Sequence, residues 1–281
     1  VVGFLGELSL GHASFMSVGA YSGSMLSVAL LQATELPLYV RLPLAMIFGG
    51  LVAAIFGVII GVPVLRLNGD YLAIVTLAFG EIVKNVIINL DFTGGAIGYD
   101  TKPIYSTPKT LLPYAAAAVI IAVILVINLA KSKHGRAITA VRDNKIAASA
   151  TGINITYYKL MVFAFSAFIA GIAGVLWGHS LSIIKAAKFD FNMSIEILVI
   201  VVLGGMGSIR GSVIAAIILK VLPEALRAVD DYRMLIHSLL LILMMLYNSA
   251  PQFASLRAKL NIKNTLVYFK NKRDKKGGKV E

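Results

Sequence analysis

Long apolar runs separated by short polar connections make up most of this chain. Eight runs are apolar enough to cross a bilayer as helices, and most have the about 20 residues that the ~30 Å hydrocarbon core requires. None shows the alternation of a barrel strand, and unpaired backbone amides are costly in lipid, so each run is predicted to be helical. The predicted spans are residues 10–31, 41–63, 71–90, 111–130, 158–178, 193–209, 211–226 and 233–250.

This pattern predicts an all-α, polytopic transmembrane helical bundle with about eight spans. The chain begins inside a further apolar run, residues 1–6, and its first residue is not Met. We therefore expect that at least one more span precedes the first residue.

The composition agrees with a membrane protein and excludes several classes of function. Charged residues make up 14% of the chain, against about 25% in soluble domains, and the mean hydropathy is +0.84. There is no Cys, the four His are far apart in the sequence, and no phosphate-binding loop motif is present. We therefore expect no enzyme activity, no metal site and no nucleotide hydrolysis in this chain itself.

Basic residues concentrate in two segments and predict the orientation of the spans. Five lie in the loop 131–157 and nine in the segment 251–281. Short loops rich in Lys and Arg stay on the cytoplasmic side, so we predict a transmembrane domain over 1–255, with a cytoplasmic loop 131–157, and a basic cytoplasmic tail over 256–281. The segment 251–281 carries seven units of the net charge of +12, nine basic against two acidic residues, which positive-inside bias and contact with anionic lipid explain, so no nucleic-acid partner is expected.

Glycines at small-x-x-x-small spacing indicate how the helices pack. This spacing lets two helix backbones approach closely in lipid, where dispersion contacts rather than the hydrophobic effect drive association. We therefore predict a tightly packed bundle, with close contacts at the pairs Gly19/Gly23, Gly57/Gly61, Gly174/Gly178 and Gly207/Gly211.

The first unusual polar segment covers residues 6–15. It carries Gly6, Gly11 and four polar side chains, Glu7, Ser9, His12 and Ser14, where the chain would otherwise be crossing lipid. One hypothesis is a broken helix whose free amides line a cavity for a polar ligand. The alternative is a helix that starts at the membrane interface, with Ser9 as its N-cap and Glu7 among the headgroups.

The second polar segment covers residues 67–81. Gly69 and Asp70 are typical of a turn followed by a helix N-terminus. Thr76 lies deeper in the predicted span, and Glu81 and Lys84 have the i, i+3 spacing at which side chains of one helix face can pair.

The third segment is the loop 131–157. It predicts a short amphipathic cytoplasmic helix over 137–150, with Ile138, Val141 and Ile146 near one face, ended by Gly152. Such a helix favours docking to a partner; the alternative is a helix lying flat on the lipid surface.

Four segments of this chain, residues 6–15, 69–82, 135–152 and 202–211, resemble in their order the M-type permease subunits of bacterial high-affinity ABC importers for branched-chain amino acids. The resemblance implies a multi-pass subunit of about ten helices in the bacterial inner membrane. It also implies a second related permease, two cytoplasmic subunits that bind ATP and Mg, and a periplasmic or lipid-anchored substrate-binding protein. This chain would hold no cofactor, and it would move leucine, isoleucine or valine inward by alternating access.

The resemblance also assigns roles to residues of this chain. Those expected along the substrate path are Glu7, Ser9, His12, Ser14 and Thr76. Those expected to couple the chain to an ATPase are Gly135, Arg136, Ala147, Ala148 and Gly152. Those expected to act as hinges or in packing are Gly6, Gly11, Gly69, Gly204, Gly205, Gly207 and Gly211.

Two alternatives for function remain open at this point. Glu7 stands where Gln is common in the family, and relatives of this permease also carry urea and short amides. An ion-coupled secondary transporter would need a buried carboxylate that changes protonation, for which Glu7, Glu81, Glu196 and Glu224 are candidates. An ion-coupled secondary transporter would have no function for the patterned loop 131–157.

Overall fold

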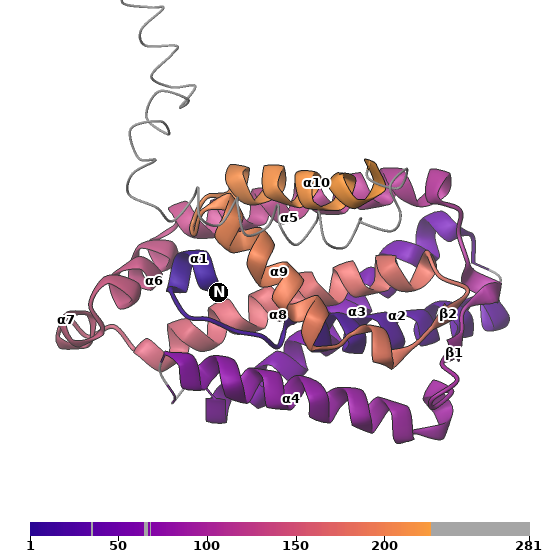
Figure 1. Ribbon diagram of the computed structural model, residues 1–281, viewed down its shortest axis with the longest axis horizontal. Coiled ribbons are helices and arrows are strands. Elements are labelled where there is room, and N and C mark those ends of the chain that lie inside the picture. The colour runs from indigo at the N-terminus through magenta and orange to yellow at the C-terminus, as the bar shows by residue number, and fades with distance from the viewer. Residues whose placement is uncertain (35, 65–66, 68, 226–281) are drawn as a thin grey trace, which may run out of the picture. The chain divides into compact units, whose positions relative to one another are not determined.

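The computed structural model describes residues 1–34, 36–64, 67 and 69–225. The predicted span 233–250 and the tail 256–281 lie outside the described residues, as does the side chain of Glu224. Contacts divide the chain into two compact units, Val1–Val202 with Met206–Ile209, and Leu203–Gly205 with the residues from Arg210 onward. The helices are α1 (Val2–Leu5), α2 (His12–Thr34), α3 (Leu38–Val64), α4 (Asp70–Asn89), α5 (Pro108–Lys131), α6 (Lys133–Asp143), α7 (Lys145–Ala150), α8 (Ile155–His179), α9 (Phe191–Gly204) and α10 (Ile209–Ala225) (Figure 1).

Five of these helices are long and apolar enough to cross a membrane: α2, α3, α4, α5 and α8. They coincide with the first five predicted spans, and the all-α transmembrane class is confirmed. The predicted runs 193–209 and 211–226 correspond to α9 and α10, which have 14 and 17 residues. The first of these runs ends early because Gly205 and Gly207 adopt positive φ angles, 88° and 85°, which an α-helix does not allow.

The centre of the first unit is the packing of α2, α3 and α8 against one another. Glycines allow their backbones to touch: a Cβ added at Gly19 would lie 2.4 Å from Gly171 Cα, and one added at Gly174 would lie 2.0 Å from Met16 O. The prediction of close helix packing is therefore confirmed at these positions. Gly207 and Gly211 do not share a helix, because Gly207 lies in the turn before α10 begins, but both make close backbone contacts: a Cβ added at Gly3 would lie 2.6 Å from Gly207 N, and one added at Gly204 would lie 2.6 Å from Gly211 C.

Apolar side chains cover the outside of these helices as well as the inside. On α3, residues such as Ile47, Leu51, Ile55 and Ile59 are each more than half exposed. Such a surface is unfavourable in water and favourable in lipid. The bundle therefore has the surface of a membrane protein.

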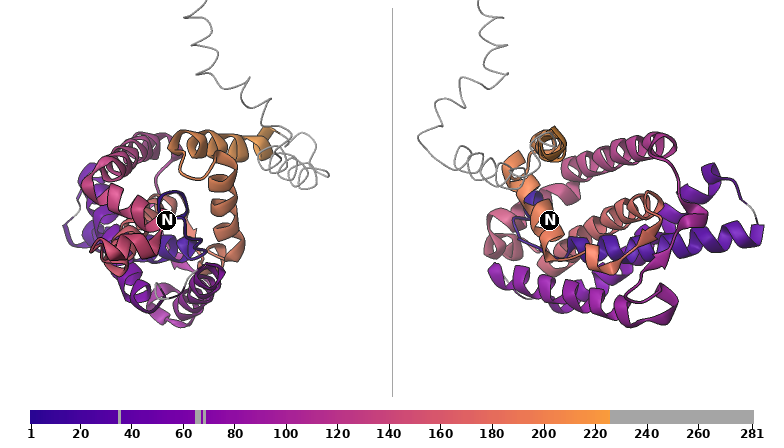
Figure 2. Two further views of the ribbon diagram at one scale, coloured as in Figure 1. Left: turned by 90° about the vertical axis from the view of Figure 1, so that its left-hand side faces the viewer. Right: turned by 45° about the vertical axis from the view of Figure 1, so that its right-hand side comes forward.

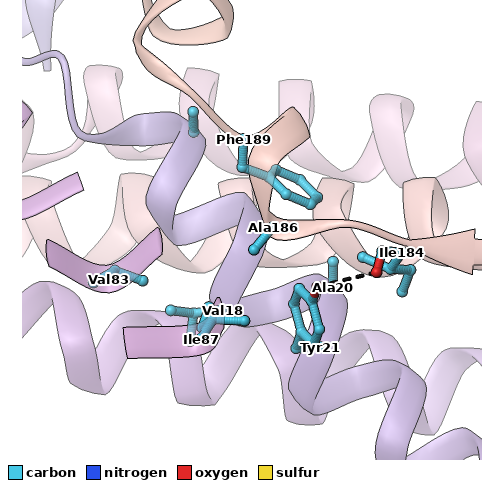
Figure 3. Close-up of a cluster of buried hydrophobic side chains, with 9 residues drawn as sticks. Val18, Ala20, Tyr21, Val83, Ile87, Ile184, Ala186 and Phe189 are labelled. Atoms are coloured by element: carbon cyan, nitrogen blue, oxygen red, sulfur yellow. Dashed lines mark hydrogen bonds between the residues drawn. The ribbon is translucent and has the colours of Figure 1, made fainter. Parts of the chain in front are cut away.

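Two short strands close one end of the first unit. β1 (Tyr99–Asp100) pairs antiparallel with β2 (Ile183–Ile184), and the 3-10 turns η1 (Asp91–Thr93), η2 (Lys102–Ile104) and η3 (Ala186–Lys188) flank them. The hydroxyl of Tyr21 donates to Ile184 O at 3.0 Å, within a cluster of buried apolar side chains drawn from α2, α4 and the segment after α8 (Figure 3). This end lies opposite α6 and α7 (Figure 1).

Candidate functional site

The broken helix predicted at the amino-terminal end is present. α1 ends at Gly6, whose φ of 72° is left-handed, and the chain runs without helix until α2 begins at His12. The N-terminal segment lies among the helices at the end that carries α6 and α7 (Figures 1 and 2). Ser9 is two residues too early to be the N-cap of α2, although its Oγ accepts from the Gly11 N–H at 3.5 Å. We refer to residues 6–11 as the break.

Side chains from α4 and α2 satisfy backbone groups of the break. The Leu10 N–H donates to Thr76 Oγ1 at 3.0 Å, and the Thr76 hydroxyl donates to Ala73 O at 3.0 Å. Ser14 Oγ donates to Gly11 O at 2.6 Å. The structure therefore brings Thr76 and Ser14 to the break, as the prediction of a common path requires, and their hydroxyls hold its backbone.

A small recess lies beside Ser14, between the start of α2, the middle of α4 and the segment that leads into α9. Its polar lining comes from Ser14, Glu81, Asp190 and Ser194. The volume is about 10 Å³, close to the room that one water needs, so this conformation offers no amino-acid-sized site there. Glu81 pairs with Lys84, which confirms the predicted i, i+3 ion pair.

Of the other predicted path residues, Ser9 and His12 lie outside this recess. Ser9 is buried in the break, and the His12 ring packs edge-on against Phe15 with centroids 6.2 Å apart.

Glu7 makes the strongest polar contacts of the break, and sequence reasoning did not foresee them. Its Oε1 forms ion pairs with Lys159 of α8 and, at 3.0 Å, with Lys145 of α7. The Glu7 and Lys159 side chains are 4% and 3% exposed, so Glu7 does not lie among the headgroups and that alternative is wrong. The signal for this cluster was Lys159 itself, because an ionisable side chain inside a span needs a partner.

The loop after α5 folds as two helices rather than the predicted one. Asn144 ends α6 and caps α7, its side chain accepting from the Ala147 N–H at 3.0 Å. Ile138 and Val141 are buried as expected, but Ile146 is 84% exposed, so the prediction that the three share a face is wrong. The reason is the interruption at Asn144, which breaks the helical period that the prediction extended through it.

The residues expected to couple to an ATPase divide between buried and exposed positions. Gly135 is buried in the first turn of α6, where a Cβ would lie 2.2 Å from Ala130 O. Ala148 is also buried. Arg136 and Ala147 are exposed, as is Gly152, which ends the loop helices with a φ of 85° as predicted.

The expected hinge glycines lie at helix ends. Gly69 precedes α4 with a φ of 62°, and Gly204 ends α9. Gly205 and Gly207 form the turn that follows, and Gly211 lies in the first turns of α10. A Cβ at Gly3 of α1 would lie 2.6 Å from Gly207 N, so the turn packs closely on α1.

These features define a multi-pass helical membrane protein with a broken helix and an adjoining pair of loop helices. A family model described as "Branched-chain amino acid transport system / permease component" matches residues 1–246, and the chain belongs to this family. It is 35% identical over 295 residues to the high-affinity branched-chain amino acid transport system permease protein LivM of Salmonella typhimurium and of Escherichia coli, covering 94% of this chain and 68% of each relative.

Two other permease proteins are also similar to this chain. The ribose import permease protein RbsC of Haemophilus influenzae is 28% identical over 247 residues, which is 84% of this chain and 74% of that protein. The permease protein LivH of S. typhimurium is 34% identical over 125 residues, 43% of this chain and 40% of LivH. No solved structure gave a significant match.

Proposed function

We propose that this chain is a translocation subunit of an ATP-driven importer that brings leucine, isoleucine and valine into a bacterium. It works by alternating access in the inner membrane, with its carboxyl terminus in the cytoplasm. The proposal is supported by the similarity to LivM along nearly the whole chain. The structural observation that carries it is the pair α6–α7, which exposes Ile146 and Ala147 at its tip while its buried side chains cluster with Leu5 of α1 and Lys145 contacts Glu7 of the break.

The proposal includes the partners that such a chain needs. LivH, a permease protein of the same named system as LivM, is also similar to this chain, which supports a second permease related to it. Two cytoplasmic subunits would bind ATP and Mg, and a periplasmic or lipid-anchored protein would deliver the substrate. The tip of α6–α7 is the surface we assign to an ATP-binding subunit.

We assign the substrate path to Ser14 and Thr76 rather than to Glu7. Both hydroxyls lie at the break, and Ser14 lines the recess, whereas the Glu7 carboxylate is committed to two lysines. The case for urea or short amides depended on Glu7 as a selectivity residue, so these contacts weaken it. The ion-coupled alternative is weakened in the same way, because Lys side chains already balance the charges of Glu7 and Glu81.

Co-purification in mild detergent tests the docking surface. Ile146→Asp places a charge where we expect an apolar contact, so it should lose most of the co-purifying ATP-binding subunits. Ile97→Asp is the matched control, because Ile97 is 79% exposed in the loop after η1, at the far end from α6 and α7. Equal recovery from the two variants would refute docking at the tip.

Uptake by the reconstituted complex tests the function. Labelled leucine should enter proteoliposomes only with ATP inside and binding protein outside, and unlabelled isoleucine or valine should compete while urea does not. Uptake driven by a proton gradient through the isolated chain would favour the secondary transporter instead.

A further inference from the structure

The cluster of Glu7, Lys145 and Lys159 joins three segments that are far apart in the sequence. Glu7 lies in the break, Lys145 is the first residue of α7, and Lys159 lies in α8. Both lysines contact Oε1 of Glu7, and Oε2 has no hydrogen-bond partner among the residues that the structure describes. The cluster therefore ties α7 and α8 to the break.

The two lysines differ in their access to water. The Lys159 side chain is 3% exposed, and the Lys145 side chain is 37% exposed. If Lys145 moves away, its ammonium group can be hydrated, and Glu7 keeps a buried partner of opposite charge. If Lys159 is lost, a buried carboxylate loses its most buried partner, and such a loss is expensive.

We propose that Lys145 is a releasable positioning residue that transmits movement of α6–α7 to the break through Glu7. Lys159 is the permanent partner that keeps Glu7 neutralised in both states. This inference rests on the proposed function, in which α6–α7 dock on an ATP-binding subunit.

The surroundings of the break support transmission through this contact. On one side, Leu5 belongs to the same buried cluster as Ile138, Val141 and Ala148, and α1 packs on α6. On the other side, the Leu10 N–H is held by Thr76 of α4. A displacement of α7 that pulls on Glu7 therefore acts on a short segment fixed at both ends, the second of which lies at the proposed path.

Thermal unfolding of the purified chain tests the permanent pair. Lys159→Met should reduce the folding equilibrium constant on the order of 100-fold or more, because it breaks a buried pair. Adding Glu7→Gln should restore most of that loss, since the buried carboxylate is removed and the ammonium group of Lys145, 37% exposed, can be hydrated. If the double variant is no more stable than Lys159→Met, the assignment of Lys159 is wrong; if Lys159→Met does not fold, recovery of folded protein in the double variant is the same test.

A distance measurement tests the proposed role of Lys145 without any transport assay. Because the chain has no Cys, Ser149→Cys and Ser180→Cys place spin labels on α7 and after α8, both at exposed positions. Lys145→Gln should broaden the distance distribution, and Lys145→Arg should preserve it because the charge remains. Lys109→Gln, an exposed lysine at the start of α5, is the control. A distribution unchanged by Lys145→Gln overturns the proposal.

The reconstituted complex tests transmission. Lys145→Gln should lower the leucine transported per ATP hydrolysed by about two- to five-fold, the scale of one partly exposed ion pair, while Lys145→Arg and Lys109→Gln retain the ratio. A merely structural role would lower the yield of folded complex without changing this ratio. An unchanged ratio of leucine transported to ATP hydrolysed in Lys145→Gln overturns the proposed role of Lys145. Absence of ATP-driven uptake in the wild-type complex overturns the proposed function itself.

Discussion

Substitution of Gly174 by Ala measures how strongly this fold depends on backbone contact between α2 and α8. The added Cβ would lie 2.0 Å from the carbonyl oxygen of Met16, and contacts under 3.0 Å are essentially never seen for real Cβ atoms. The obstacle is backbone, which cannot rotate away. The two helices must therefore separate by about 1 Å at this point.

The cost of that separation follows from the dispersion contacts along the interface. A gap of ~0.5–1 Å forfeits a quarter to a half of each contact energy, and overpacking of this kind costs typically ~1–3 kcal/mol. Ala favours a helix over Gly by about 1 kcal/mol, which offsets part of the loss. We expect Gly174→Ala to destabilise the protein by up to roughly 2 kcal/mol, because helix association in lipid depends on such contacts.

Gly80→Ala provides the matched comparison within another spanning helix. Its Cβ would meet only Ser14, at 3.6 and 3.8 Å, which are ordinary contact distances. We expect it to be neutral or to stabilise by up to about 1 kcal/mol through helix propensity. Thermal unfolding of both purified variants in one detergent makes the comparison, and equal melting temperatures would refute the argument from backbone contact.

Two further predictions concern polar caps. Asn144→Ala should destabilise the N-terminus of α7 by about 1 kcal/mol, because the Asn144 side chain caps the Ala147 N–H. Hydrogen exchange of the amides of Ala147–Ala150 should accelerate, while exchange in α8 stays the same. Unchanged exchange over Ala147–Ala150 would contradict this prediction. Burial disfavours the Asp190 carboxylate, but hydrogen bonds from the Met193 N–H and the Asn192 side chain outweigh it and lower the pKa of Asp190. The stabilising contribution of the ionised Asp190 is therefore complete above the ordinary pKa of 3.8 and is lost as the pH falls through the lower pKa of the folded state. The melting temperature of wild type should exceed that of Asp190→Asn by less and less below about pH 4. A difference in melting temperature that stays constant down to about pH 3 would contradict this prediction.

Local patterns of the sequence predicted a large part of the fold. Hydropathy located the five spanning helices because a helix in lipid must satisfy its own backbone and present apolar side chains along its whole length. Glycine spacing predicted that helices pack closely at Gly19 and Gly174, though not which helices meet there, and the i, i+3 spacing predicted the pair Glu81–Lys84. Each of these features depends on neighbours within a few turns of one helix.

Predictions failed where a single residue interrupts a periodic pattern. Asn144 divides the loop helix and leaves Ile146 exposed, since its side chain caps a new helix instead of continuing the old one. Gly205 and Gly207 end the run 193–209 early for a related reason, their left-handed backbone conformation. Hydrophobic periodicity contains no information about such interruptions.

The sequence by itself determined that this chain is a helical membrane protein, and its motifs placed it among transport permeases, because hydropathy and short motifs are local properties. Only the tertiary structure decided what Glu7 does. Its distance of 138 residues from Lys145 leaves the pairing to the packing of the break against α7 and α8. A buried charge must find an opposite charge wherever the fold provides one, and which one it finds is a property of the assembled bundle.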